Sequence, residues 1–384
     1  MPSVIVVGAG LAGLNCARTL TRKSFEVVVL EKSDRVGGRI KTDLIDGFRF
    51  DHGFQVLNPS YSEVQRLGIR QELNMRYLPK GFEIELAEKQ FLMGDPRENL
   101  RYISAALSNA SGTLSEKIAF LSFLIRKPAD ISLGDSMRTS GRLYRDVIKG
   151  FLDGVFLTDS DEVSSLMAHE LLRWFVKGNP GIPELGMEVL PKLMASGLDI
   201  RFNREVLEVK DGHVTTNEGE LKADFVVMAA DPNRTRRLIG EPEIKMNKSW
   251  TWYHALAKGA ITSAHLRVLR HDPFVNSVAI SNISSKYAPE NQTLISSTTL
   301  HEISSEEALR ATARAWQVPQ SQIQALQRYE IKESLPFHAP KKPISSPQQI
   351  SERIFVAGDS FSIPAQQGAL KSGRLAAELV IARR

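Results

Sequence analysis

The sequence of 384 residues predicts an α/β fold, α+β overall, in which a nucleotide-binding domain is interleaved with a mixed helical and β-sheet domain. Near the start, the apolar, β-branched run Ser3–Val7 has the composition of a buried parallel strand, and a glycine-rich turn follows it. Near the other end, Ile354–Ala357 has the pattern of a strand and Gly368–Ile381 that of a helix. Because both ends carry such a unit, the middle of the chain must supply the second domain.

The turn after the first strand has the spacing G-x-G-x-x-G, formed by Gly8, Gly10 and Gly13. We expect Gly8 to permit a tight turn, Gly10 to let the backbone approach a pyrophosphate, and Gly13 to let a helix pack closely on the strand. That helix begins at Leu11 and includes Ala12, and its first backbone N–H groups are expected to face the phosphates. The pattern therefore predicts a dinucleotide site.

A second apolar strand, Val27–Leu30, ends at Glu31, and Lys32 follows it. The separation between Gly13 and Glu31 suits a carboxylate that reaches the ribose hydroxyls from the tip of that strand. Strand, turn, helix, strand and acid together predict a Rossmann-like domain. The motif alone does not separate NAD from FAD.

The residues after Glu31 resemble a known group. Gly37, Gly38 and Arg39 are similar to the G-G-R segment of the FAD-dependent flavin amine oxidase, protoporphyrinogen oxidase and phytoene desaturase superfamily. The resemblance implies FAD as the cofactor and an Arg39 side chain that approaches its phosphates. A guanidinium suits this role because it forks onto phosphate oxygens and stays charged.

The C-terminal strand, turn and helix resemble the same superfamily. The resemblance implies that Gly358 and Asp359 form the turn and that Asp359 meets the ribityl or phosphate region of FAD. It also implies that Gln367, Gly368 and Ala369 open the last helix, with free N–H groups toward the pyrimidine edge of the flavin. Such donors stabilise the negative charge of a reduced flavin.

Two further segments resemble superfamily pieces, one along the isoalloxazine ring and one, in a strand expected over 199–209, at the adenine. The strand expected over 223–230 resembles the return strand to the FAD domain. The residues that the resemblance assigns to cofactor contacts here are Gly53, Phe54 and Gln55 at the ring and Val206 at the adenine.

No residue is assigned as catalytic, because the flavin carries the chemistry. His52 is a candidate acid or base, although a histidine beside an aspartate is more often a hydrogen-bonded structural residue. Trp252 and His254 are further candidates on one face of an expected strand, with Tyr253 on the other face. Whether these large side chains line a pocket or fill the core stays open.

The order of the matches predicts two interleaved domains. The FAD-binding domain is expected to comprise residues 1–60, 190–235 and 345–384, and the substrate domain residues 61–189 and 236–344. The first insert is expected to be mainly helical, around Pro96–Lys127 and Asp161–Lys177, and the second largely stranded, over Ser249–Val268 and Ser277–Leu300.

Composition narrows the classes of function. The 49 basic and 44 acidic residues give a net charge of +5, a mixed surface without the footprint of a nucleic-acid-binding protein. The densest basic group, Arg234, Arg236 and Arg237, is expected to be a solvated loop. The single cysteine, Cys16, excludes an internal disulfide and a cysteine-based metal site, and its helical spacing places it in the core. No metal is expected.

The first strand begins at Ser3 and leaves no room for a leader, so we expect a cytoplasmic chain. The apolar run Ile118–Ile125 is too short to span a bilayer. With Arg126 and Lys127 beside it, the run is compatible with peripheral contact to a membrane, while a buried helix or a lid over the substrate pocket is the commoner explanation. The oligomeric state is not indicated.

The residues and the resemblance together predict an FAD-dependent oxidoreductase. Flavin N5 is expected to take a hydride from a C–N or C–C bond of a largely apolar small molecule. Amine oxidases of the superfamily commonly carry an aromatic residue three positions before the glycine of the last helix. This chain has Ala365 there, which weakens the case for an amine in particular.

Three alternatives stay open. One is a carotenoid-type or isoprenoid desaturase or isomerase at a membrane surface. Another is a non-enzymatic binding protein like the GDP-dissociation inhibitors, which use a similar fold without flavin; the intact glycine motif disfavours it. An NAD-only dehydrogenase is disfavoured by the C-terminal segment. The electron acceptor, oxygen or another, is not indicated.

Overall fold

The computed structural model describes residues 1–86, 89–94, 102–103, 108–270 and 272–383. Its first sheet is a five-stranded parallel sheet with the strand order β19–β13–β1–β2–β9. These strands are β1 (Ser3–Val7), β2 (Glu26–Leu30), β9 (Asp199–Arg201), β13 (Phe225–Met228) and β19 (Ile354–Val356). The α/β fold class is therefore confirmed, and three separate stretches of the chain build this one sheet.

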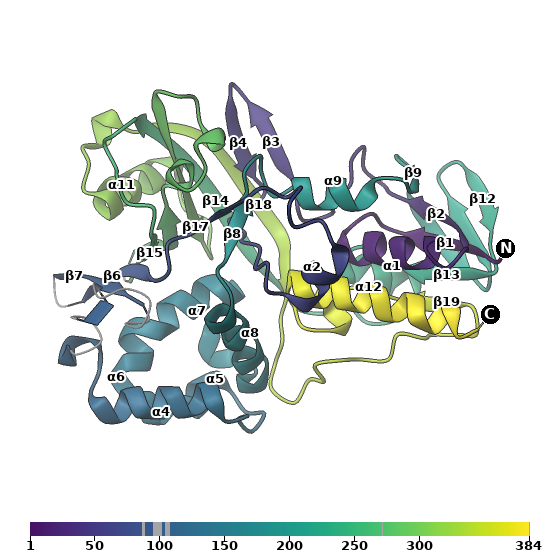
Figure 1. Ribbon diagram of the computed structural model, residues 1–384, viewed down its shortest axis with the longest axis horizontal. Coiled ribbons are helices and arrows are strands. Elements are labelled where there is room, and N and C mark those ends of the chain that lie inside the picture. Colours follow the sequence, from purple (N-terminus) through teal and green to yellow (C-terminus); the bar gives the residue numbers. More distant parts are fainter. Residues whose placement is uncertain (87–88, 95–101, 104–107, 271, 384) are drawn as a thin grey trace.

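Side chains of β1 alternate between two cores, one on each face of the sheet. Val4 and Val6 pack against α1 (Leu11–Thr21) and α12 (Gln366–Ile381), which lie side by side in Figure 1. Ile5 and Val7 pack on the opposite face with residues of α10 and of a small antiparallel sheet. These elements are α10 (Pro232–Leu238), β10 (Val206–Lys210), β11 (His213–Thr216) and β12 (Gly219–Lys222).

The helices α1 and α12 approach each other closely because Gly373 has no side chain. A Cβ atom at this position would lie 2.0 Å from the carbonyl oxygen of Ala12. Cys16 of α1 is fully buried in the same core, as its spacing predicted. Helix α12 begins at Gln366, two residues before the predicted start, because the chain is extended only up to Ala365.

Two local predictions were wrong. The stretch 199–209 does not form one strand, because the turn at 202–205 separates β9 in the parallel sheet from β10 in the small sheet. Arg234, Arg236 and Arg237 do not form a loop but lie on α10. Each pairs with a carboxylate, of Glu205, Glu241 and Glu243 respectively, which neutralises the basic group.

The second large sheet has seven strands in the order β18–β14–β17–β16–β15–β6–β7, antiparallel except for the pair β15–β6. The strands are β6 (Phe82–Leu86), β7 (Lys89–Met93), β14 (Met246–Ala257), β15 (Leu266–Val268), β16 (Phe274–Val278), β17 (Gln292–Thr299) and β18 (Gln324–Pro336). Helix α11 (Ser305–Trp316) packs on one face of this sheet, mainly against β14. The second insert is thus largely stranded, as predicted.

Helices of the first insert gather into one lobe beside this sheet (Figure 1). They are α4 (Leu114–Ile125), α5 (Leu133–Ser136), α6 (Gly141–Leu143), α7 (Lys149–Phe156) and α8 (Ser165–Lys177). The prediction over Pro96–Lys127 falls partly outside the described residues, but α4 and α8 lie within the predicted helical regions. In the part of the chain that is described, no helix combines the length and apolarity needed to cross a membrane.

Short strand pairs connect the two sheets, and the buried carboxylate of Asp51 holds one of these pairs in place. In the first pair, β3 (Thr42–Ile45) is antiparallel to β4 (Phe48–Asp51), and in the second, β5 (Met75–Tyr77) is antiparallel to β8 (Gly181–Pro183). The short helices α2 (Ser62–Leu67) and α9 (Val189–Ala195) belong to the same connecting segments. Asp51 accepts hydrogen bonds from the Thr42 hydroxyl, from the Tyr287 hydroxyl at 2.7 Å and from the Met187 N–H at 3.0 Å. Burial nevertheless raises the pKa of Asp51 from 3.8 to about 6.

This pKa predicts how stability depends on pH. Because folded Asp51 binds its proton more tightly than the unfolded chain does, the free energy of unfolding falls as pH rises from about 4 to about 6. The loss attributable to this group is at most about 3 kcal/mol. Asp51→Asn mimics the protonated acid and is expected to flatten this slope in denaturant titrations at several pH values.

The exposed carboxylate of Asp46, in the turn of the same hairpin, offers a matched control. Asp46→Asn is expected to keep the slope of the unmodified protein. Equal slopes for the unmodified protein and Asp51→Asn would show that Asp51 does not carry this pH dependence.

Candidate functional site

A cavity of about 1000 Å³ runs from the glycine turn of the parallel sheet to the helical lobe. Gly10 and Glu31 line it at the first end, and Phe151 of α7 and Leu171 of α8 line it at the other. The loop after β2, the start of α12 and residues of β14, β16, β17 and β18 line the part between. Both large sheets therefore contribute to one continuous space.

The three glycines of the motif differ in what surrounds them. Gly8 has a φ of +103°, and a Cβ there would lie 2.6 Å from the carbonyl oxygen of Ala229. A Cβ on Gly13 would lie 1.9 Å from the carbonyl oxygen of Gly8, so Gly13 lets α1 pack onto the turn. A Cβ on Gly10 would meet nothing within 4 Å, and Gly10 lines the cavity. Its bare backbone is thus open to a ligand.

Glu31 lies at the end of β2 on the cavity wall and is 6% exposed. One carboxylate oxygen accepts a hydrogen bond from the N–H of Ala9 at 2.8 Å, and the other accepts from the N–H and the hydroxyl of Ser33. These bonds fix the carboxylate against the glycine turn. The neighbouring Lys32 also lines the cavity and pairs with Asp231 at 2.7 Å.

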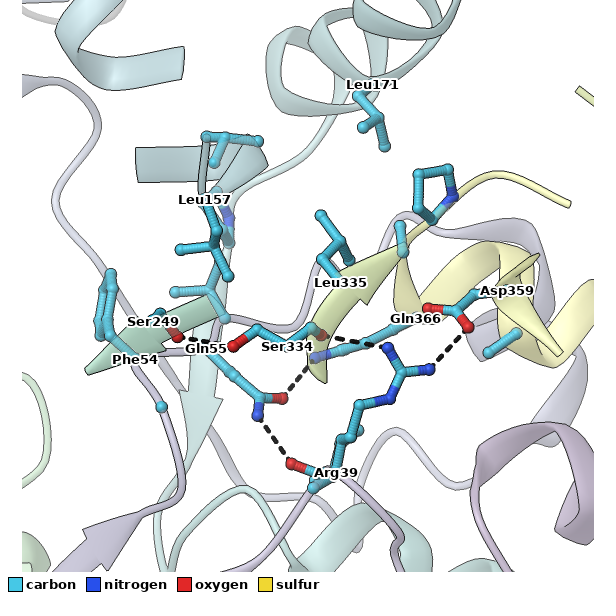
Figure 2. A pocket seen from close by; sticks show the side chains of 18 of the residues that line it. Arg39, Phe54, Gln55, Leu157, Leu171, Ser249, Ser334, Leu335, Asp359 and Gln366 are labelled. Carbon is cyan, nitrogen blue, oxygen red and sulfur yellow. Dashed lines mark hydrogen bonds and ion pairs between the residues drawn. The ribbon is translucent and has the colours of Figure 1, made fainter. Parts of the chain in front are cut away.

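Arg39 lines the cavity and connects three segments of the chain, as Figure 2 shows. Its guanidinium donates to Asp359 Oδ1 at 2.6 Å and to the carbonyl oxygen of Ser334 at 3.1 Å. Gln55 donates its amide N–H to the carbonyl oxygen of Arg39 at 3.1 Å, and Gln366 contacts the Gln55 oxygen at 3.5 Å. Residues from both ends of the chain thus meet β18.

The first turn of α12 faces the cavity through Gln366 and Ala369. The side-chain oxygen of Gln366 is buried and has no hydrogen-bond partner among the residues that the structure describes. Gln367 points away from the cavity, since its amide bonds to Ser62 and Glu63 at α2. Gly368 packs against the backbone of Ile363, where a Cβ would lie 1.8 Å from the carbonyl oxygen. The residue of this turn that offers a polar side chain to the cavity is therefore Gln366, which the sequence analysis missed.

Most residues predicted to bind the cofactor line this cavity, and three do not. Gly13, Gln367 and Gly368 lie behind its wall, for the packing reasons given above. The predicted residues that line it are Gly8, Gly10, Leu11, Ala12, Glu31, Lys32, Gly38, Arg39, Gly53, Phe54, Gln55, Val206, Gly358, Asp359 and Ala369. Their contacts with a bound cofactor stay a prediction.

His52 lines the cavity and belongs to a hydrogen-bonded cluster. Its Nε2 lies 2.8 Å from Asp43 Oδ2, which also accepts the Tyr329 hydroxyl at 2.7 Å. Although burial raises the pKa of Asp43, bonds from Tyr329, His52 and Arg35 lower it to about 2. Burial lowers the pKa of His52 despite Asp43, so a neutral imidazole stands beside an ionised carboxylate at neutral pH. The cluster fixes the start of the segment Gly53–Gln55.

Trp252 and His254 do not line the cavity. Both point from β14 toward α11, where Trp252 joins a buried apolar cluster and His254 lies 3.2 Å from the Thr312 hydroxyl. Burial lowers the pKa of His254 to about 4. Tyr253, on the opposite face, donates its hydroxyl to the carbonyl oxygen of Asp51 at 2.8 Å. Both faces of this strand segment are core, which settles the alternative that the sequence left open.

Comparisons with known proteins agree with this geometry. The chain matches the family model described as flavin containing amine oxidoreductase over residues 11–381. Among curated relatives, Polyamine oxidase 3 of Oryza sativa subsp. japonica is 30% identical over 261 residues, which cover 59% of this chain and 51% of that protein. Polyamine oxidase 2 of Arabidopsis thaliana is 30% identical over 259 residues, with 59% and 50% covered. The chain thus spans about half the length of these relatives.

Solved structures show the same fold. A putrescine oxidase bound to putrescine superposes with a TM-score of 0.74 at 17% identity, over 99% of each chain. Cyclohexylamine oxidase from Brevibacterium oxydans IH-35A superposes with a TM-score of 0.72 at 16% identity, over 100% of each chain. At such identities the likeness establishes the fold alone.

Fold and site define a flavoprotein of the oxidoreductase class, and the residues present fit FAD. Three features suited to FAD line one cavity of about 1000 Å³: the uncrowded backbone of Gly10, the buried acid Glu31, and the Gln366 oxygen, which has no partner among the described residues. The chain belongs to the flavin containing amine oxidoreductase family, and its cofactor is FAD. The family match therefore excludes the alternative of an NAD-only dehydrogenase.

The glycine geometry predicts opposite outcomes for two alanine variants. Gly10→Ala adds a methyl group into open cavity space at a φ of −75°, which alanine adopts freely, so folding is expected to be unchanged. FAD affinity is expected to fall at least roughly tenfold, because the methyl group occupies the space of the phosphates. Released flavin and the far-UV spectrum of the purified variant measure both effects.

Gly13→Ala is the matched comparison, because its methyl group would overlap the backbone of Gly8. It is expected to lower the thermal midpoint of the apoprotein, whereas Gly10→Ala leaves that midpoint in place. Full flavin retention by Gly10→Ala would contradict the placement of the phosphates at this turn.

Proposed function

We propose that this protein oxidises an amine of largely apolar character, with transfer of a hydride from the carbon next to nitrogen to flavin N5. The observation that carries the proposal is the continuity of the cavity, which joins the nucleotide-binding turn to an apolar chamber in the helical lobe. The bound FAD supplies the redox chemistry. The residues of the chain bind and orient both partners and exclude water.

The chamber is apolar on several sides. Six of its lining residues come from α4, from α7 and the residue after it, and from α8: Phe120, Leu124, Phe151, Leu157, Leu171 and Phe175. Such walls bind apolar groups by removing their surface from water. They also dry the space near the reacting atoms, which strengthens the electrostatic effects of the few polar groups there.

Ala365 is part of the wall at the start of α12. The superfamily resemblance implies an aromatic residue at this position in amine oxidases, which would narrow the space in front of the flavin. The small side chain here leaves room for a bulkier group next to the amine. This difference supports a wide, apolar substrate.

The carboxylates among the described lining residues all belong to the nucleotide end of the cavity and all have partners. Glu31 is held by Ala9, Glu205 lies 3.2 Å from Arg234, Asp231 pairs with Lys32, and Asp359 pairs with Arg39. A substrate with several ammonium groups needs carboxylates along its length. The polyamine oxidases are named for such substrates, but the described part of this chamber favours a single amine.

Anaerobic titration of the purified flavoprotein tests this function. Apolar primary monoamines are expected to bleach the visible flavin band, and diamines of equal length are expected to do so with at least roughly tenfold lower kcat/KM, because the second ammonium would be buried without a partner. Absence of bleaching with every amine tested would refute amine oxidation by this chain. Equal efficiency for monoamines and diamines would refute the preference alone.

The surface of α4 supports a second candidate, oxidation or isomerisation of an isoprenoid lipid at a membrane. Four exposed apolar residues follow one helical stripe, Leu114, Ile118, Leu121 and Ile125, with exposed fractions from 55% to 74%. Leu121 also lines the cavity, so the stripe reaches its opening. Arg126 directly follows the helix and adds a positive charge suited to anionic lipid.

Vesicle co-sedimentation tests this candidate. The unmodified protein is expected to bind vesicles that contain anionic lipid, and the double variant Ile118→Ser/Ile125→Ser is expected to bind several-fold less, because burial of each side chain contributes apolar area. Leu44→Ser, at an equally exposed position on the β3–β4 hairpin, is the control. Failure of the unmodified protein to bind vesicles would refute the second candidate function, action on an isoprenoid lipid at a membrane.

A further inference from the structure

Two polar side chains of the seven-stranded sheet face the cavity. Asn276 of β16 and Thr298 of β17 are cross-strand partners, which places their Cβ atoms about 5 Å apart. Both line the cavity, and they are 6% and 3% exposed. They form a small polar patch among apolar neighbours such as Val155 and Val268.

Both side chains have a polar atom without a partner. Asn276 Oδ1 and Thr298 Oγ1 are buried and make no hydrogen bond within the described part of the chain. Gly154 of α7 lies over the patch, and a Cβ there would lie 2.7 Å from the Asn276 amide nitrogen. The glycine therefore lets α7 approach the amide nitrogen of Asn276, while Asn276 Oδ1 stays without a partner among the described residues. Since buried polar groups are nearly always hydrogen-bonded, a ligand or a displaceable water must supply the missing bonds.

We propose that Asn276 and Thr298 bind a hydroxyl group of the substrate. The O–H of such a group donates to Asn276 Oδ1, and its oxygen accepts from the Thr298 hydroxyl. A carbonyl group lacks the proton that Asn276 Oδ1 requires. An ammonium group carries charge that no described carboxylate at this end of the cavity balances. A neutral hydroxyl group satisfies both atoms at once.

The patch is remote from the segment that meets Arg39. Ser334, whose carbonyl oxygen binds Arg39, lies on β18, and β16 is three strands away in the sheet order. Three strand spacings amount to about 14 Å. The inference rests on the proposed function for the other end of the substrate, and the two together specify an amino alcohol whose amine and hydroxyl groups are separated by an apolar chain.

Three probes of equal chain length separate the possibilities. Octylamine, the corresponding terminal amino alcohol and the corresponding terminal diamine are titrated into the FAD-loaded protein, and binding is followed by the thermal midpoint and by perturbation of the flavin spectrum. The amino alcohol is expected to bind roughly tenfold more tightly than octylamine, and the diamine more weakly than either. Tightest binding by octylamine or by the diamine would overturn the proposal.

The variants Asn276→Leu and Thr298→Val remove the polar atoms and keep the side-chain size. Each is expected to reduce the preference for the amino alcohol over octylamine to about one, because either change leaves the hydroxyl group without one of its partners. An unchanged preference in both variants would overturn the subsite.

Thr251→Val is the matched control. Thr251 of β14 lies opposite Thr298 and is buried, and its hydroxyl makes no hydrogen bond to any described residue, but it does not line the cavity. Its substitution is expected to leave the preference of the unmodified protein in place. Loss of the preference in Thr251→Val as well would assign the effect to the sheet rather than to the cavity surface and would overturn the proposal.

Binding and oxidation are measured separately, so the two proposals fail separately. If the amino alcohol binds through Asn276 and Thr298 but no probe bleaches the flavin, amine oxidation fails and the hydroxyl subsite stands. If octylamine bleaches the flavin and neither variant changes the preference, the subsite fails and amine oxidation stands.

Discussion

The ion pair between Arg39 and Asp359 is the contact on which the site depends most. Asp359 is buried, and its partner also holds the backbone of β18 through the carbonyl oxygen of Ser334. The loop after β2, the turn after β19 and the edge of the second sheet therefore meet at one guanidinium. A buried carboxylate that loses its partner is left uncompensated, at a cost of about 3–5 kcal/mol. The guanidinium thus links the two sheets across the cavity, through its ion pair with Asp359 and its hydrogen bond to Ser334.

Much of the nucleotide end was predictable from sequence because its determinants are local. The run Ser3–Val7, the glycine spacing and Glu31 follow one another directly, and each corresponds to a specific backbone requirement in the structure. The error at 199–209 has a different origin: its alternating apolar residues fit either one strand or two. Only the sheet that each half joins decides, and that choice is made by residues far away in the chain.

The part of the cavity beyond the nucleotide end had no comparable signal. Gln366 was missed because the helix begins two residues before the glycine from which its start was predicted. The patch of Asn276 and Thr298 depends on the pairing of β16 with β17, and nothing in either strand alone indicates it. Trp252 and His254 were candidate catalytic residues because of their residue types, but the alternation of side chains along the strand directs both toward α11. Residue type predicted chemistry well only where backbone geometry was also predictable.

This contrast separates what the family determines from what the individual chain determines. The cofactor is the same throughout the family, and it is bound by a glycine backbone, one acid and one guanidinium. The spacing of these groups therefore recurs as a motif. Substrate selectivity arises where a largely apolar chamber offers few polar atoms, because each unpartnered atom penalises every ligand that cannot satisfy it. In this chain such atoms on the seven-stranded sheet are uncharged. The proposed subsite would therefore discriminate by hydrogen bonding and shape, whereas carboxylates would discriminate by charge.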